Sequence, residues 1–143
     1  MAKGLATLIR LAKWTVDEKR RALVALQTRE DQLLATIAEA ERALAREKQV
    51  AAADSTGVGF GYAAFARAWL DRRAQLDATL AALRVELARA ADDLAAAYGE
   101  LKTYEITQRE RDRRAQAERD RKEQAVLDEI GQTRHRRRAA ESP

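Results

Sequence analysis

Few residues in this chain could carry out chemistry. The single histidine, His135, stands within the basic run Arg134–Arg138, where no neighbouring acid or nucleophile would orient it as a general base. Two pairs of adjacent carboxylates, at 92–93 and 128–129, could attract a cation, but neighbours on a helix point about 100° apart and make poor metal pairs. Cysteine is absent, which excludes thiolate catalysis and cysteine-based metal sites. We therefore predict a protein that is not an enzyme and uses no metal, cofactor or small-molecule substrate.

A glycine-rich segment at residues 57–61, Gly-Val-Gly-Phe-Gly, invites comparison with phosphate-binding loops. Such loops follow a β-strand within a βαβ unit or precede a Lys-Ser or Lys-Thr pair, and this chain offers neither context. Three glycines in five residues disfavour a helix by about 1 kcal/mol each. The Asp-Ser-Thr sequence at 54–56 adds side chains that compete for backbone hydrogen bonds. Residues 54–61 are therefore predicted to form a turn.

The composition indicates long helices in a reducing compartment. Of 143 residues, 35% are charged and only 5% are aromatic, and no proline precedes Pro143. No apolar run approaches the ~20 residues that span a bilayer, and the start of the chain lacks the pattern of a secretory signal. Together with the lack of cysteine, this predicts a cytosolic coiled-coil protein.

A sustained heptad pattern runs from Tyr62 to Tyr104. Apolar residues recur there at alternating steps of four and three, which places them along one side of a helix. Because a helix with one apolar stripe is not stable alone in water, this helix needs a partner. Its expected coiled-coil core residues are Leu76, Leu80, Leu83, Leu87, Leu94 and Leu101.

The partner is predicted upstream in the same chain, from about residue 4 to residue 53. The same stepping recurs there, interrupted by the polar residues Lys19, Glu30 and Glu47, which in coiled coils commonly fix the register. The core residues expected from this helix are Leu23, Leu26, Leu33 and Ile37.

Together these segments predict an all-α fold, a long antiparallel two-helix coiled-coil hairpin with a longer, overhanging second helix. Helix one covers about 4–53, the turn 54–61, helix two about 62–135 and a basic C-terminal tail 134–143, in one unit of residues 1–143. A turn centred near Val58 places Leu33 opposite Leu83 and Ala40 opposite Leu76. Large residues then often meet small ones, which favours pairing within one chain. Exchange of helix two between two protomers stays open.

The apolar stripe stops after Tyr104. Residues 105–124 interleave both signs of charge and are expected to form a solvated helix that overhangs helix one. An apolar group then returns at 125–130, beside two carboxylates, and is a candidate docking site because helix one does not reach it. At the other end, Tyr62 and Trp69 are expected to cap the hairpin. Phe60 and Phe65 are left as either caps or partner-binding residues.

These features coincide with a known family, and the chain resembles the FliJ-type flagellar export proteins over essentially its whole length. The resemblance rests on the opening segment 5–13, the helix at 62–104, the charged stretch that follows, and the segment Glu-Gln-Ala-Val-Leu-Asp-Glu-Ile at 123–130 before a basic tail. It implies the soluble stalk component of the flagellar type III export apparatus, similar to the central stalk of rotary ATP synthases. Such a stalk inserts in and stimulates a hexameric export ATPase.

The resemblance also implies further partners, namely the export gate membrane protein and export chaperones. It places the protein in the cytoplasm, at the cytoplasmic face of the inner membrane, held there through protein partners. It leaves flagellar and injectisome systems undistinguished. The residues expected to contact the ATPase ring are Val126, Leu127, Asp128, Glu129 and Ile130.

Two other functions are compatible with the sequence. The first is a coiled coil that binds nucleic acid through Arg134–Arg138, although the interleaved acids and the lack of aromatic residues along this stretch argue against it. The second is a generic dimeric scaffold.

Overall fold

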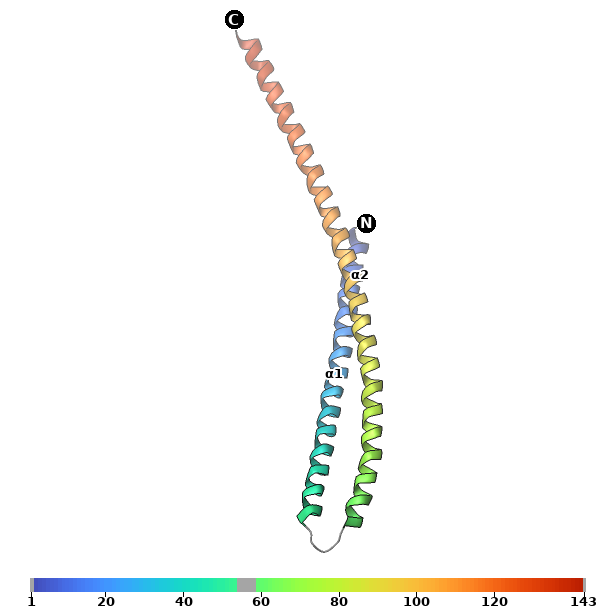
Figure 1. Cartoon of the computed structure of the whole chain (residues 1–143). Helices are drawn as coiled ribbons and strands as arrows, with labels where there is room; N and C mark the ends of the chain where they lie inside the picture. The colour runs from blue at the N-terminus through green and yellow to red at the C-terminus, as the bar shows by residue number, and fades with distance from the viewer. Residues whose placement is uncertain (1, 54–58, 143) are drawn as a thin grey trace. The chain divides into compact units, whose positions relative to one another are not determined.

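The computed structural model describes residues 2–53 and 59–142, with side chains for residues 4–53 and 61–142. This part of the chain forms two helices, α1 (Ala2–Ala53) and α2 (Gly59–Glu141), and no strand (Figure 1). With 83 residues, α2 is much longer than α1, which has 52. The prediction of an all-α fold with two packed helices and a longer second helix is confirmed.

The ends of α2 differ from the predicted bounds of 62 and 135. The helix begins at Gly59, and most of the predicted turn, residues 54–58, lies outside the described residues. At the other end the helix continues to Glu141, so the basic residues of the predicted tail are helical. Arginine and alanine are good helix formers, and Gly131 alone does not stop the helix. Arg138 in the last turn also interacts favourably with the negative end of the helix dipole.

The chain divides into two compact units. We call Ala12–Tyr98 the hairpin unit, and Met1–Leu11 together with Gly99–Pro143 the terminal unit. Each unit contains a part of both helices.

Within the hairpin unit the two helices run antiparallel, side by side (Figure 1). Side-chain contacts between them show the direction, since positions 69, 84 and 98 of α2 contact positions 40, 30 and 20 of α1. Leu33 and Leu83, which the predicted register places opposite each other, line one shallow depression. The middle of the hairpin unit therefore agrees with that register.

The predicted seam carries most of the less exposed side chains of the hairpin unit. Ala12, Val16, Ile37, Leu83 and Ala97 are at most 8% exposed. Of the other apolar residues expected in the core of this unit, all are half-buried, because two helices enclose each layer on only part of its circumference. They are Leu23, Leu26, Leu33, Leu76, Leu80, Leu87 and Leu94.

Polar residues on the seam pair across the helices at its edge. Arg73 forms an ion pair with Glu41 of α1, and this hydrogen bond raises the pKa of the guanidinium. The Glu30 carboxylate of α1 accepts a hydrogen bond from Nε of Arg84 at 3.3 Å. Pairs this exposed to water contribute little to stability, so their main effect is on which residues meet.

In the terminal unit, most of the side chains that are shielded from solvent lie near Leu5 on α1 and between residues 101 and 110 on α2. Leu5 is 6% exposed and Ile9 is half-buried on α1, and all but one of the half-buried residues of α2 in this unit lie between Leu101 and Glu110. From residue 111 to residue 142 every described side chain is exposed except that of Glu118, which is half-buried. This long continuation of α2 is thus a solvated helix.

Candidate protein-docking surfaces

An exposed apolar group lies in the solvated part of α2. Val126, Leu127 and Ile130 are 55%, 58% and 48% exposed. Their spacing puts them on one side of the helix, within about 100° of one another. Asp128 lies on another side, and its carboxylate accepts a hydrogen bond from the Gln124 amide at 2.9 Å. With Glu129, these residues are the ones for which the sequence predicts partner contact, and the structure leaves their apolar side chains open to solvent.

Four eight-residue repeats occupy residues 108–139 and contain this group. They read QRERDRRA, QAERDRKE, QAVLDEIG and QTRHRRRA, and we call them octads 1 to 4. In the first three, the glutamine at the first position donates a hydrogen bond to the aspartate at the fifth, at 2.8, 2.8 and 2.9 Å. The heptad seam does not predict this repeat, whose signal in the sequence is the recurrence of Gln and Asp every eight residues.

Octads 1 and 2 carry their own ion pairs. Glu110 pairs with Arg113 at 2.7 Å and with Arg114 at 3.3 Å, and Glu118 pairs with Arg121. Eight residues turn a helix by about 800°, so each octad is rotated by about 80° from the one before it. The charged pairs therefore wind around the helix and leave no apolar side. Such pairs between residues three and four positions apart support a solvated helix.

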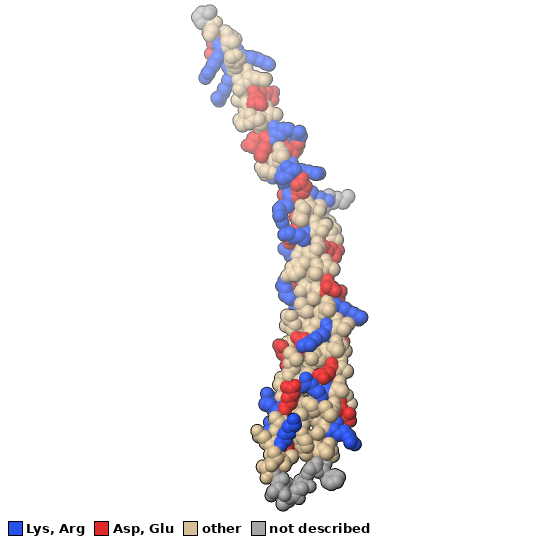
Figure 2. Space-filling view, in the orientation of Figure 1, with Lys and Arg blue, Asp and Glu red and all other residues tan. Residues whose placement is uncertain are grey.

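Octads 3 and 4 depart from this pattern in opposite directions. The charged residues Glu118, Arg119 and Lys122 of octad 2 are replaced in octad 3 by the three apolar residues of the exposed group. Octad 3 consequently has two carboxylates and no cation. Octads 1 and 2 share acids at their third and fifth positions, and in octad 4 arginines take these positions, at 134 and 136. Octad 4 therefore holds four arginines and no carboxylate. Figure 2 shows the resulting change from mixed charges to mainly basic side chains at the C-terminal end of α2.

Glu110 is the titratable group of these repeats whose environment changes it most clearly. The hydrogen bond from Arg113, with a further one from Arg114, lowers the pKa of its carboxyl from 4.5 to about 2. Because the pKa is lower in the folded state, the stabilisation is complete above pH 4.5 and is lost as the pH falls toward about 2.

We expect the helix content of octads 1 and 2 to fall over this acid range. Glu110→Gln should make the fall smaller, because the amide cannot gain a proton there. The measurement is circular dichroism of the chain between neutral pH and pH 2, with Glu123→Gln as the control, since no ion pair of Glu123 is found in the described part of the chain. Equal acid sensitivity of Glu110→Gln and the unaltered chain would contradict this role.

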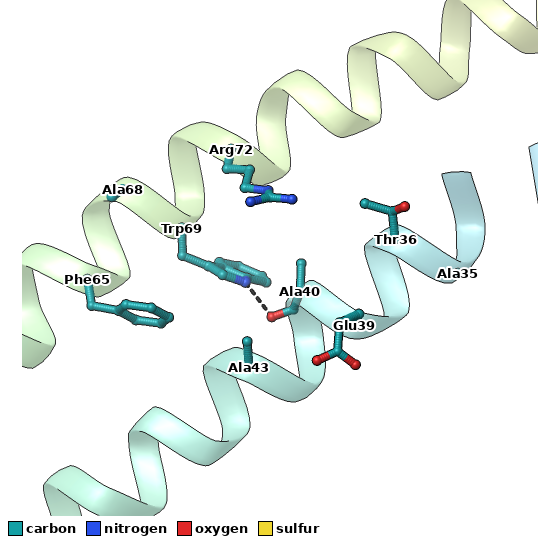
Figure 3. A pocket seen from close by; sticks show the side chains of 9 residues that line it. All are labelled: Ala35, Thr36, Glu39, Ala40, Ala43, Phe65, Ala68, Trp69 and Arg72. Atoms are coloured by element: carbon teal, nitrogen blue, oxygen red, sulfur yellow. Dashed lines mark hydrogen bonds between the residues drawn. The ribbon is translucent and has the colours of Figure 1, made fainter. Parts of the chain in front are cut away.

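A groove lies between the helices near the glycine-rich end of the hairpin unit (Figure 3). Its volume is about 550 Å³. Phe65 and Trp69 point from α2 toward α1, and small side chains of α1 leave them room (Figure 3). Both aromatic residues are half-buried, as is Tyr62, whereas the Phe60 side chain lies outside the described residues. The lining consists of Ala35, Thr36, Glu39, Ala40, Ala43, Phe65, Ala68, Trp69 and Arg72.

Trp69 changes the pairing at this groove. Its Nε1–H donates a hydrogen bond to the carbonyl oxygen of Ala40 at 2.6 Å (Figure 3). The predicted register places Ala40 opposite Leu76, two helical turns from Trp69. A large indole beside small alanines can reach further along the partner helix than a leucine, which a register built on seam positions does not anticipate.

The rim of the groove is charged and partly self-paired. Glu39 accepts hydrogen bonds from Arg46 at 2.9 Å and from Arg42 at 3.0 Å. These bonds hold the pKa of the Glu39 carboxyl below its usual range. Arg72 completes the rim from α2.

Neither a cluster of metal ligands nor a membrane span is found among the described residues. His135 is exposed on α2 between arginines. No group of three or more potential ligands for a metal ion is found within 2–53 and 59–142. Neither described helix combines the length and apolarity required of a membrane span.

Comparison with known families identifies a match over most of the chain. A family model described as "Flagellar FliJ protein" matches residues 1–140. Curated proteins and solved structures yield no significant match. The family match covers nearly the whole chain, including the groove and all four octads.

Proposed function

The chain belongs to the flagellar FliJ family, and from this premise we propose that it is the stalk component of the flagellar type III export apparatus, which inserts in the hexameric export ATPase and stimulates it. Membership of the family supports a role in flagellar export. The ATPase, the gate and the chaperones as partners, and the location at the cytoplasmic face of the inner membrane, are parts of the proposal.

The observation that carries this proposal is the apolar group of octad 3. It lies beyond the residues that α1 covers. The octads before it are charged and form ion pairs within the helix. An exposed helical stripe of this kind fits an apolar pocket of a protein partner. Octads 1 and 2 would then separate the docking residues from the covered part of the terminal unit.

In this proposal the chain acts by binding the export ATPase and catalyses no reaction itself. A ligand shifts an equilibrium only by its difference in affinity between the two states. A stalk that contacts several subunits at once binds the assembled ring better than separate subunits. It therefore favours the ring, and stimulation of ATP hydrolysis follows from assembly.

The groove at Phe65 and Trp69 is proposed as the surface for a second partner, the export gate or a chaperone. Its lining is mainly apolar, and its two aromatic side chains are only half-buried. Aromatic residues at a concave apolar surface are typical of protein interfaces. The groove and octad 3 belong to different units, so two partners could be bound by separate surfaces.

The test is ATP hydrolysis by the purified export ATPase, with and without this chain. We expect the unaltered chain to stimulate hydrolysis, and a chain truncated after Gln124 to keep its hairpin helicity and lose the stimulation. Stimulation by the truncated chain would move the working surface to the groove. Tighter binding to duplex DNA than to the ATPase at moderate salt would favour the nucleic-acid alternative.

A further inference from the structure

Two arginines of octad 4 continue the apolar side of octad 3. Arg134 and Arg137 follow Ile130 by four and seven residues, a spacing that keeps side chains on one side of a helix. One shallow depression on α2 is lined by Val126, Glu129, Ile130, Thr133, Arg134 and Arg137. We call Val126, Leu127, Ile130, Arg134 and Arg137 the docking strip. It extends for about 16 Å along the helix.

Resting on the function proposed above, we propose that the docking strip is a two-part element that fits a protein groove with an apolar socket followed by a carboxylate-lined wall. The socket receives the three apolar side chains. The carboxylates meet Arg134 and Arg137, nearer the C-terminus of α2. The strip thus specifies the chemistry of the ATPase surface that it contacts.

The octads differ in the charge at their third position, and this difference points to carboxylates on the partner. In octads 1 and 2 the third position holds Glu110 and Glu118, each paired with an arginine three residues later. In octad 4 the third position is Arg134, and no ion pair is found for the arginines of this octad in the described part of the chain. Their planar donors are therefore free for an outside acceptor, and carboxylates match that geometry with two parallel hydrogen bonds.

The neighbouring residues favour a protein over a nucleic acid or a lipid surface. Asp128 and Glu129 lie between one and three turns before the arginines and would repel the continuous array of phosphates on a nucleic acid or an anionic membrane. Residues 112–142 contain no Phe, Tyr or Trp that could stack on bases or enter a membrane interface. A protein groove, unlike a regular array of phosphates, can place carboxylates opposite the two arginines and none opposite Glu129, which lines the same depression. Asp128, on another side of the helix, can stay in water.

The test compares neighbouring arginines on different sides of α2. Arg137→Gln alters the docking strip, whereas Arg136→Gln makes the same charge change about 100° away. Arg134→Gln with Arg137→Gln removes both cations of the strip. Affinity of each full-length chain for the purified export ATPase is measured at about 0.1 M and about 1 M salt, between which the Debye length falls from ~10 Å to ~3 Å.

We expect the double variant to bind about tenfold more weakly at the lower salt and to lose much of the salt dependence. Arg136→Gln should stay within about twofold of the unaltered chain, since its charge lies off the strip. Circular dichroism checks that all variants keep their helix content.

Several results would overturn the inference. If Arg136→Gln and Arg137→Gln weaken binding to the ATPase equally, only the general positive charge of octad 4 matters, and the docking strip is wrong. If the double variant binds as tightly as the unaltered chain, the proposed carboxylate wall is wrong, whereas the proposed function is unaffected. Stronger, arginine-dependent binding to duplex DNA or to anionic vesicles would assign octad 4 to those partners. If the unaltered chain fails to bind the ATPase at all, the proposed function fails first, and the inference fails with it.

Discussion

Converting octad 3 into a copy of octad 2 at its three apolar positions is expected to abolish stimulation of the export ATPase while α2 keeps its helix content. The changes are Val126→Glu, Leu127→Arg and Ile130→Lys. Full burial of one such apolar side chain is worth about 1.5–3 kcal/mol, so losing three removes several kcal/mol of binding. Glutamate, arginine and lysine are good helix formers, and at these positions octad 2 shows that they are compatible with a solvated helix.

The control for this variant uses the same positions one octad earlier. Glu118→Gln, Arg119→Gln and Lys122→Gln change three residues of octad 2 and should leave stimulation nearly unchanged. ATP hydrolysis and circular dichroism are measured for both variants. Full stimulation by the octad 3 variant would exclude the apolar group as the ATPase contact and leave the groove at Phe65 and Trp69 as the remaining candidate.

Replacing Leu83 by alanine is expected to destabilise the hairpin by about 2–3 kcal/mol. Leu83 is 8% exposed, which makes it one of the most enclosed leucines of the described chain. Removing buried volume of this size typically costs 2–5 kcal/mol, and the lower part of that range applies because a two-helix layer is only partly enclosed. The melting temperature should fall by roughly 5–10 °C for a chain of this length.

Leu70 provides the matched control, since it is also a leucine on α2 but is 62% exposed. Leu70→Ala should change the free energy of unfolding by no more than about 0.5 kcal/mol. Thermal melts followed by circular dichroism compare the two variants. Similar losses for both would mean that the seam does not determine the stability of the hairpin unit.

The seam could be predicted because it depends on a long and regular pattern. Steps of four and three persist from Leu5 to Ala51 and from Tyr62 to Tyr104, and a helix has only one way to place such residues on one side. All of the predicted seam positions in these ranges are buried or half-buried in the structure except Glu47. Absence of proline within the helices leaves no competing signal.

Other features depend on side-chain reach and on a different period. The hydrogen bond from Trp69 to Ala40 joins residues that the predicted register separates, because a heptad count carries no information on how far an indole extends. The heptad pattern does not reveal the octads, because residues eight positions apart do not stay on one side of a helix. The roles of Phe65 and of the docking residues 126–130 stay predictions, since exposure shows that a surface is open but not which partner covers it.

The number of residues in the octads also determines the direction in which the docking residues face around the axis of α2. Removing one whole octad would draw the docking residues about 12 Å closer to Leu101 and Tyr104 and turn them by about 80° around the helix axis. Removing 18 residues, five full turns, would shorten the same path by about 27 Å without changing the direction in which the docking residues face. The length of this charged segment therefore sets an azimuth as well as a distance, so a partner that engages both ends of the terminal unit would sense insertions by their angle.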